Sequence, residues 1–140
     1  MTPSDTDAVA VSIVVPVRNE AENVAPLVAE IVSALDGRWA YEIIYVNDGS
    51  TDATAGRLAD LMKQHAQLRQ LRHANSSGQS AAVRSGVRAA RGAIVATLDG
   101  DGQNNPVFLP DLIAAVENGS GRVGLAAGQR LAHFVDPPGG

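Results

Sequence analysis

One stretch decides the fold, and it reads Ala93-Ile-Val-Ala-Thr-Leu-Asp-Gly-Asp-Gly-Gln103. Its apolar first half predicts a buried strand over 93–98, and two carboxylates, Asp99 and Asp101, follow that strand directly. Residues two apart in an extended chain face the same side, so these carboxylates converge. They would repel each other, and a bound divalent cation removes that cost. Carboxylate oxygens are hard ligands, which suit Mg²⁺ or Mn²⁺.

Strand-like and helix-like segments alternate on both sides of this stretch. Short apolar or β-branched runs predict further strands over 11–17, 41–46, 68–71 and 123–127. Apolar residues at helical spacing predict helices over 22–35, 50–65, 78–90 and 108–116. Such alternation indicates βαβ units, so we expect an α/β fold with a Rossmann-like, doubly wound, mostly parallel sheet.

The chain has enough residues for one folded domain, which we expect over 11–130. The segments on either side carry no pattern of strand or helix. We therefore expect a disordered leader over 1–10 and an irregular tail over 131–140.

Composition excludes several classes of function. The 140 residues include no cysteine, which excludes disulfides, thiolate metal sites and cysteine nucleophiles. The net charge is −4 and only 4% of the residues are aromatic, so we expect no nucleic-acid partner. The acidic first residues differ from the basic start of a signal peptide, and we expect a cytoplasmic chain.

Three polar clusters follow predicted strands, at 16–20, 47–52 and 99–103. Because parallel strands place their carboxyl ends at one edge of a sheet, we expect these clusters to meet where a ligand binds. Each cluster also has a plainer explanation. Asn19 could cap the following helix, 50–52 could be a turn and a cap, and Asp-Gly pairs are common in turns.

Four motifs together resemble family 2 glycosyltransferases, in particular the polyprenyl-phosphate branch that is similar to dolichol-phosphate mannose synthase. They occur in the family's order and spacing and span about 11–129. The chain differs at Arg18, where the family often has tyrosine, and at Asn47 and Asn105, where it often has aspartate. The motifs are Val14-Val-Pro-Val-Arg-Asn-Glu20, Val46-Asn-Asp-Gly-Ser-Thr-Asp52, Gly78-Gln-Ser-Ala-Ala-Val83 and Leu98-Asp-Gly-Asp-Gly-Gln-Asn-Asn-Pro106.

The resemblance implies a fold of the GT-A type that binds a nucleotide-diphospho-sugar. It implies that Asp99, Asp101 and Gln103 hold Mg²⁺ or Mn²⁺, which bridges the diphosphate and offsets the charge that develops on it. It also implies that Asp48 contacts the base or the ribose. The nucleotide-sugar-binding residues implied in this way are Pro16, Val17, Asn19, Glu20, Asn47, Asp48, Ser50, Gln79, Ala82, Asp99, Gly100 and Asp101.

The implied activity is metal-dependent transfer of a hexose from a UDP- or GDP-sugar to an acceptor such as polyprenyl phosphate. A lipid-linked acceptor would bring the chain to the inner face of the membrane. The sequence identifies no catalytic base. Family members of this branch are longer, so we interpret the chain as truncated, with the donor-binding half, and a sheet edge left open would favour an oligomer.

Two other functions stay open at this point. The first is a non-catalytic nucleotide-binding remnant or scaffold. The second is a haloacid-dehalogenase-like phosphatase, in which Asp99 would be the nucleophile and Asp101 the general acid. That chemistry normally needs a threonine shortly after the pair and a lysine further along, whereas the only lysine here is Lys63.

Overall fold

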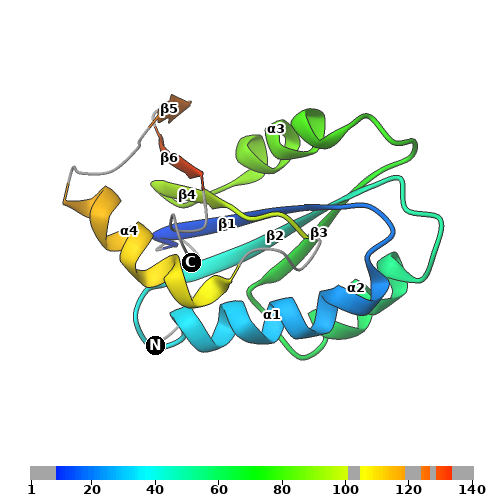
Figure 1. The fold of residues 1–140 in the computed structure, drawn as a ribbon, viewed down its shortest axis with the longest axis horizontal. Helices are drawn as coiled ribbons and strands as arrows, with labels where there is room; N and C mark the ends of the chain where they lie inside the picture. The colour runs from blue at the N-terminus through cyan, green and yellow to red at the C-terminus, as the bar shows by residue number, and fades with distance from the viewer. Residues whose placement is uncertain (1–8, 101–104, 119–123, 127–128, 134–140) are drawn as a thin grey trace.

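The computed structural model describes residues 9–100, 105–118, 124–126 and 129–133. Strands and helices alternate along them, as predicted (Figure 1). In chain order they are β1 (Val11–Val17), α1 (Ala21–Leu35), β2 (Tyr41–Asp48), α2 (Thr54–Met62), β3 (Leu68–His73), α3 (Gln79–Ala89), β4 (Ile94–Thr97), the 3-10 helix η2 (Pro106–Phe108), α4 (Leu109–Glu117), β5 (Gly124–Ala126) and β6 (Gln129–His133).

The described strands form one sheet in the order β3-β2-β1-β4-β6-β5. Neighbouring strands are parallel except for β5 and β6, which confirms the mostly parallel α/β fold. The chain runs outward from β1 through β2 to β3 and then returns to β4 on the other side of β1. The strand order therefore reverses between β1 and β4, and such a switch point is where ligands bind in sheets of this kind.

Helices cover both faces of the sheet. α1, α2 and α4 pack on one face, and α3 packs on the other (Figure 1). Alternate residues of β1 serve the two sides: Ile13 and Val15 join the larger cluster, whereas Val14 joins the smaller one. Because both faces are covered, the strands read as continuous apolar runs, which is why the sequence located them.

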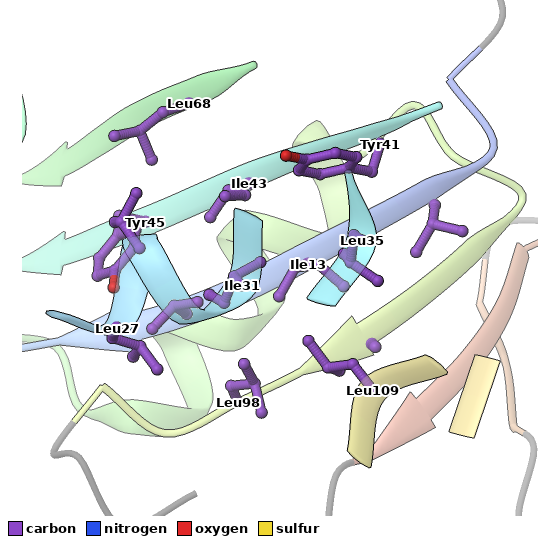
Figure 2. Close-up of a cluster of buried hydrophobic side chains, with 14 of the residues drawn as sticks. Ile13, Leu27, Ile31, Leu35, Tyr41, Ile43, Tyr45, Leu68, Leu98 and Leu109 are labelled. Atoms are coloured by element: carbon purple, nitrogen blue, oxygen red, sulfur yellow. The ribbon is translucent and has the colours of Figure 1, made fainter. Parts of the chain in front are cut away.

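Among the described residues, the larger core contains one buried side-chain polar atom without a hydrogen-bond partner. Figure 2 shows Tyr45 of β2 within a cluster that includes Leu27 and Ile31 of α1. The Tyr45 side chain is fully buried, and no described residue forms a hydrogen bond with its hydroxyl group. Burial raises the pKa of this phenol well above its ordinary value, so the hydroxyl stays neutral.

A buried carboxylate, that of Glu42, lies near the start of β2. Glu42 is 1% exposed, and its oxygens accept hydrogen bonds from Ser12 Oγ at 2.6 Å and from the backbone N–H of Arg91 at 2.7 Å. The guanidinium groups of Arg69 and Arg91 lie 2.9 and 3.1 Å from Glu42 Oε1. Burial by itself raises the pKa of Glu42, but these bonds and charges outweigh it and leave the pKa lowered.

The boundaries of the domain differ from those predicted. β6 extends to His133 and pairs with β4 and β5, whereas the sequence predicted an irregular tail from 131. The polar residues Gln129 and Arg130 are not typical of a buried strand, so the sequence pattern did not predict it. The strand forms by backbone pairing with the edge of β4. Ala10, assigned to the leader, already bonds to Ala40 and Ile94. The remaining leader and tail, 1–8 and 134–140, lie outside the described residues.

The second helix is shorter than predicted. The sequence suggested 50–65, but α2 covers Thr54–Met62. The residues just before it turn toward the start of α1 instead, where Asp52 and Thr54 accept hydrogen bonds from the backbone N–H groups of Ala21 and Glu20. None of the described helices is long and apolar enough to cross a membrane.

Candidate functional site

A cavity of about 280 Å³ opens at the carboxyl edge of the sheet, at the switch point between β1 and β4. Four separate segments of the described residues line it: the end of β1 with the residues after it, the end of β2, the start of α3 and the residues after β4. The lining residues are Pro16, Val17, Arg18, Glu20, Asp48, Gln79, Ala82, Asp99 and Gly100.

The structure brings most of the predicted site residues to this cavity, and it also adds one. Arg18 lines the cavity and is the only cationic side chain among the lining residues, although the sequence did not place it there. Asn19, Asn47 and Ser50 were predicted in the site but are not among the lining residues. The predicted ligands at 101 and 103 lie outside the described residues. Nucleotide binding by any of these residues stays a prediction.

Asn19 has a structural task in the loop between β1 and α1. Its backbone is left-handed, with φ of 55°, which asparagine tolerates better than most residues. Its side-chain oxygen accepts hydrogen bonds from the backbone N–H groups of Thr51 at 2.8 Å and Asp52 at 3.3 Å. Its own N–H donates to Ser50 Oγ at 2.9 Å. Asn19 therefore holds the first loop against the second, and Glu20 rather than Asn19 is the N-cap of α1. A contact of Asn19 with a nucleotide stays a prediction.

Asn47 braces the second loop from within. Its side-chain oxygen accepts a hydrogen bond from the backbone N–H of Ser50, and its amide nitrogen donates to Gln70 Oε1 on β3. Asn47 and Ser50 line a separate hollow beside Arg72 and His73. The two loops thus lie side by side, as expected. The side chains of Asn19, Asn47 and Ser50 form hydrogen bonds within and between these loops.

Asp48 is the most heavily bonded carboxylate at this edge. It is 4% exposed and accepts hydrogen bonds from the backbone N–H groups of Ser77 at 2.8 Å and Gly78 at 2.9 Å. Ser76 Oγ donates to it at 2.9 Å, and His73 Nδ1 lies 2.8 Å away. Burial by itself raises the pKa of Asp48, but these four bonds outweigh it and hold the pKa at about 2.

Acid should destabilise the fold through Asp48. In the unfolded chain this carboxyl takes up its proton near its ordinary pKa of 3.8, whereas in the folded chain it does so only near 2. Between these values the unfolded state binds more protons, so stability is fully present above about pH 5 and falls toward pH 2. We expect this group to contribute about 1–2 kcal/mol of that fall.

Urea unfolding between about pH 2 and 6 measures this contribution. The Asp48→Asn variant should be less stable than the wild type at neutral pH, and the gap should shrink as the pH falls. A gap of constant size across this range would show that the Asp48 charge does not carry the effect.

Asp99 is held at the rim of the cavity from two sides. Gln79 Nε2, at the start of α3, donates a hydrogen bond of 2.8 Å to Asp99 Oδ1. The next residue, Gly100, bonds through its N–H to the carbonyl of Pro16 at 3.3 Å. A Cβ atom at Gly100 would lie 2.8 Å from that carbonyl oxygen and would collide with Val17, so only glycine allows this close approach to β1.

The described residues include no group of three histidine, aspartate or glutamate side chains close enough to hold a metal ion. Two of the lining carboxylates have oxygens directed to neighbours: Asp48 to its four donors and Glu20 Oε1 to Asn23 Nδ2 at 2.7 Å. Asp99 is a further lining carboxylate, and its Oδ1 accepts the hydrogen bond from Gln79. Carboxylate oxygens of this kind are ligands that suit a divalent cation.

Sequence reasoning assigned no role to His73. The register of the sheet contained the signal, because Asp48 and His73 are direct partners at the ends of β2 and β3. Its second ring nitrogen, Nε2, lies 2.9 Å from Ser85 Oγ on α3. His73 therefore links two strands and a helix beside the cavity.

The sequence matches a known family along nearly its whole length. Residues 12–138 match the family described as Glycosyl transferase family 2. Dodecaprenyl-phosphate galacturonate synthase of Rhizobium johnstonii is 37% identical over 120 residues, which are 83% of this chain and 35% of that protein. Dolichol-phosphate mannosyltransferase of Pyrococcus furiosus is 36% identical over 110 residues, which are 79% of this chain and 31% of that protein. The chain spans about a third of the length of these relatives.

Solved structures share the fold. The mannosyltransferase PcManGT from Pyrobaculum calidifontis, in complex with GDP-Man and Mn²⁺, matches 65% of this chain and 27% of its own, with a TM-score of 0.61 and 27% identity. S. aureus TarS in complex with UDP-GlcNAc matches 78% of this chain and 31% of its own, with a TM-score of 0.66. Its 22% identity supports the fold alone.

These likenesses agree with the strand order and with the four motif segments around the cavity. They confirm the GT-A fold. The chain belongs to glycosyl transferase family 2.

Proposed function

We propose that this chain binds the nucleotide-diphospho-sugar donor of a metal-dependent glycosyltransferase that transfers a hexose to a lipid-linked phosphate. One observation carries the proposal: four segments that contain the family's motifs converge on a single cavity at the switch point. The proteins named above support the donor and the acceptor, because PcManGT is in complex with GDP-Man and the names of the two relatives contain dodecaprenyl-phosphate and dolichol-phosphate.

A divalent cation fits the residues at the rim of the cavity. Asp99 presents a carboxylate there. The side-chain amide of Gln79 orients this carboxylate without neutralising its charge. Oxygen ligands of this type suit Mg²⁺ or Mn²⁺, and the PcManGT structure contains Mn²⁺. When bound, the cation would stabilise the negative charge of the departing diphosphate. Arg18, on the loop between β1 and α1, would add a second positive charge on the same side.

A lipid-linked acceptor would place the working enzyme at a membrane surface. We propose a cytoplasmic chain that meets polyprenyl phosphate at the inner face of the membrane. The described residues line a cavity for a donor, and the acceptor would approach from its open side. Self-association through the edge strand β3 would be compatible with this arrangement, because the cavity lies at the carboxyl ends of the strands.

Calorimetric titration tests the donor site directly. The chain should bind UDP or GDP, and the affinity should be higher with Mn²⁺ than with a chelator present. At a concentration of 100 times its Kd, the preferred nucleotide should stabilise the fold by about 2.7 kcal/mol, which a thermal melt detects. Uridine and guanosine, which lack the diphosphate, are the matched ligands and should show no Mn²⁺ effect.

A second experiment on the same protein distinguishes a transferase from a binding module. Incubation with the sugar form of the preferred nucleotide and polyprenyl phosphate in vesicles should release the nucleoside diphosphate. Binding without release would favour the non-catalytic module. Absence of binding to both nucleotides, with and without Mn²⁺, would overturn the proposed function.

A further inference from the structure

A connected set of hydrogen bonds runs from β3 to the rim of the cavity. We propose that His73 and Asp48 are positioning residues for Asp99: they fix the first turn of α3, and Gln79 in that turn orients the Asp99 carboxylate. This inference rests on the proposed function, because it assigns the Asp99 carboxylate to a bound cation. The positioning task of Asp48 is additional to the contact with base or ribose that the family resemblance implies.

The first step joins two strands and a helix. A carboxylate only accepts hydrogen bonds, so His73 Nδ1 carries the proton that faces Asp48 Oδ1 at 2.8 Å. In the neutral ring Nε2 is then an acceptor, and Ser85 Oγ donates to it at 2.9 Å. Ser85 belongs to α3, so His73 ties the middle of that helix to the ends of β2 and β3.

The second step fixes the segment that leads into α3. Both carboxylate oxygens of Asp48 are engaged here: Oδ1 accepts from the backbone N–H of Ser77, and Oδ2 accepts from the N–H of Gly78 and from Ser76 Oγ. Gly78 has φ of 97° and is the N-cap of α3. The helix begins without a side-chain cap of its own, so Asp48 supplies the anchor from another strand.

The third step reaches the metal-binding carboxylate. Gln79 is the first residue of α3 and follows the two N–H groups that Asp48 holds. Its Nε2 donates to Asp99 Oδ1 at 2.8 Å across the cavity. A shift of the first turn would therefore move the donor that sets the orientation of Asp99. Partners of this kind, one step behind a metal ligand, change metal affinity by about 10- to 100-fold when they are removed.

We call the hydrogen bonds that lead from His73 through Asp48 and Gln79 to Asp99 the relay, and the affinity for Mn²⁺ tests it. Electron paramagnetic resonance measures this affinity on the folded protein, well below its melting temperature. Gln79→Leu should weaken Mn²⁺ binding by about tenfold or more, and His73→Phe should weaken it by a similar factor. His73→Asn should restore most of the affinity, because its amide nitrogen can donate to Asp48 in place of Nδ1. His65→Phe, just before β3 and outside the relay, is the matched control and should bind Mn²⁺ like the wild type.

Rescue by asparagine separates positioning from stability. If His73 were purely structural, both His73→Phe and His73→Asn would lower the melting temperature, and His73→Asn would bind Mn²⁺ no better than His73→Phe. Equal Mn²⁺ affinity in the wild type and in His73→Phe would overturn the relay while leaving the proposed function intact. If the wild type binds neither Mn²⁺ nor nucleotide, the proposed function fails, and nuclear magnetic resonance of the Gln79 side-chain amide judges the relay. An amide signal unchanged by His73→Phe would then overturn it.

Discussion

Replacing Glu42 by alanine is expected to lower the free energy of unfolding by about 3 kcal/mol, the lower end of the range for breaking a buried ion pair. The Glu42 side chain is 2% exposed, whereas the side chains of Arg69 and Arg91 are 32% and 51% exposed. Water can therefore resolvate the two arginines in part. The loss still leaves two guanidinium groups close together and Ser12 Oγ and the Arg91 N–H without their acceptor.

Two further variants show whether the charge or the mere burial of a polar group matters. Glu42→Gln keeps the shape and one acceptor oxygen, so it should cost less than alanine, about 1.5–3 kcal/mol. Tyr45→Phe removes a buried polar atom from the same strand that has no hydrogen-bond partner among the described residues. It should leave stability unchanged or raise it slightly, because no bond is lost.

Urea unfolding of the wild type and the three variants at neutral pH measures these differences. Small domains have a total stability of about 5–15 kcal/mol, so a loss of 3 kcal/mol is large and easily resolved. Similar losses for Glu42→Ala and Tyr45→Phe would contradict the interpretation that the bonds of Glu42 carry the effect.

The main strands and helices could be predicted because burial on both faces marks them. The predicted first strand, 11–17, coincides with β1, and the predicted helix over 22–35 ends with α1 at Leu35. β6 could not be predicted in this way. Its backbone pairs with β4, but Leu131 and Ala132 are its only apolar residues, which is too short a run for the prediction to detect.

The position of the cavity was also predictable, because parallel strands place their carboxyl ends at one edge of the sheet. Which neighbouring side chain faces the cavity was not. Arg18 lines it and Asn19 does not, and the difference comes from a left-handed backbone at Asn19 that the N–H groups of the second loop stabilise. That contact joins residues 32 positions apart, and no local pattern reports it.

The two polar networks escaped prediction for a related reason. His73 reaches a partner 25 residues away, and Glu42 reaches one 49 residues away in Arg91. In the sequence, Glu42 is a single charge within an apolar run, and His73 is a single histidine after a weak strand. Only the register of the sheet and the packing of α3 bring their partners together.

Asp99→Asn is expected to abolish the Mn²⁺-dependent part of nucleotide binding. The substitution keeps the size of the side chain and removes the charge. The Gln79 amide can still donate to the remaining carbonyl oxygen, so the local fold should persist. Loss of a direct ligand should exceed the effect of losing a partner behind it, so we expect Mn²⁺ affinity to fall by more than about 100-fold.

Asp60→Asn provides the matched control for this change. Asp60 is 75% exposed on α2, beside Lys63, and lies outside the residues that line the cavity. It undergoes the same chemical change and the same loss of one negative charge. Any general effect of net charge on the binding of an anionic nucleotide should therefore appear equally in both variants.

Calorimetric titration with the preferred nucleoside diphosphate, with Mn²⁺ and with a chelator, gives the decisive comparison. In the wild type and in Asp60→Asn the two conditions should differ, whereas in Asp99→Asn they should coincide at the weaker affinity. With the chelator present, Asp99→Asn should bind the nucleotide at least as tightly as the wild type does. Without a cation, the Asp99 carboxylate of the wild type repels the diphosphate. Mn²⁺-stimulated binding that persists in Asp99→Asn would place the cation elsewhere in the chain.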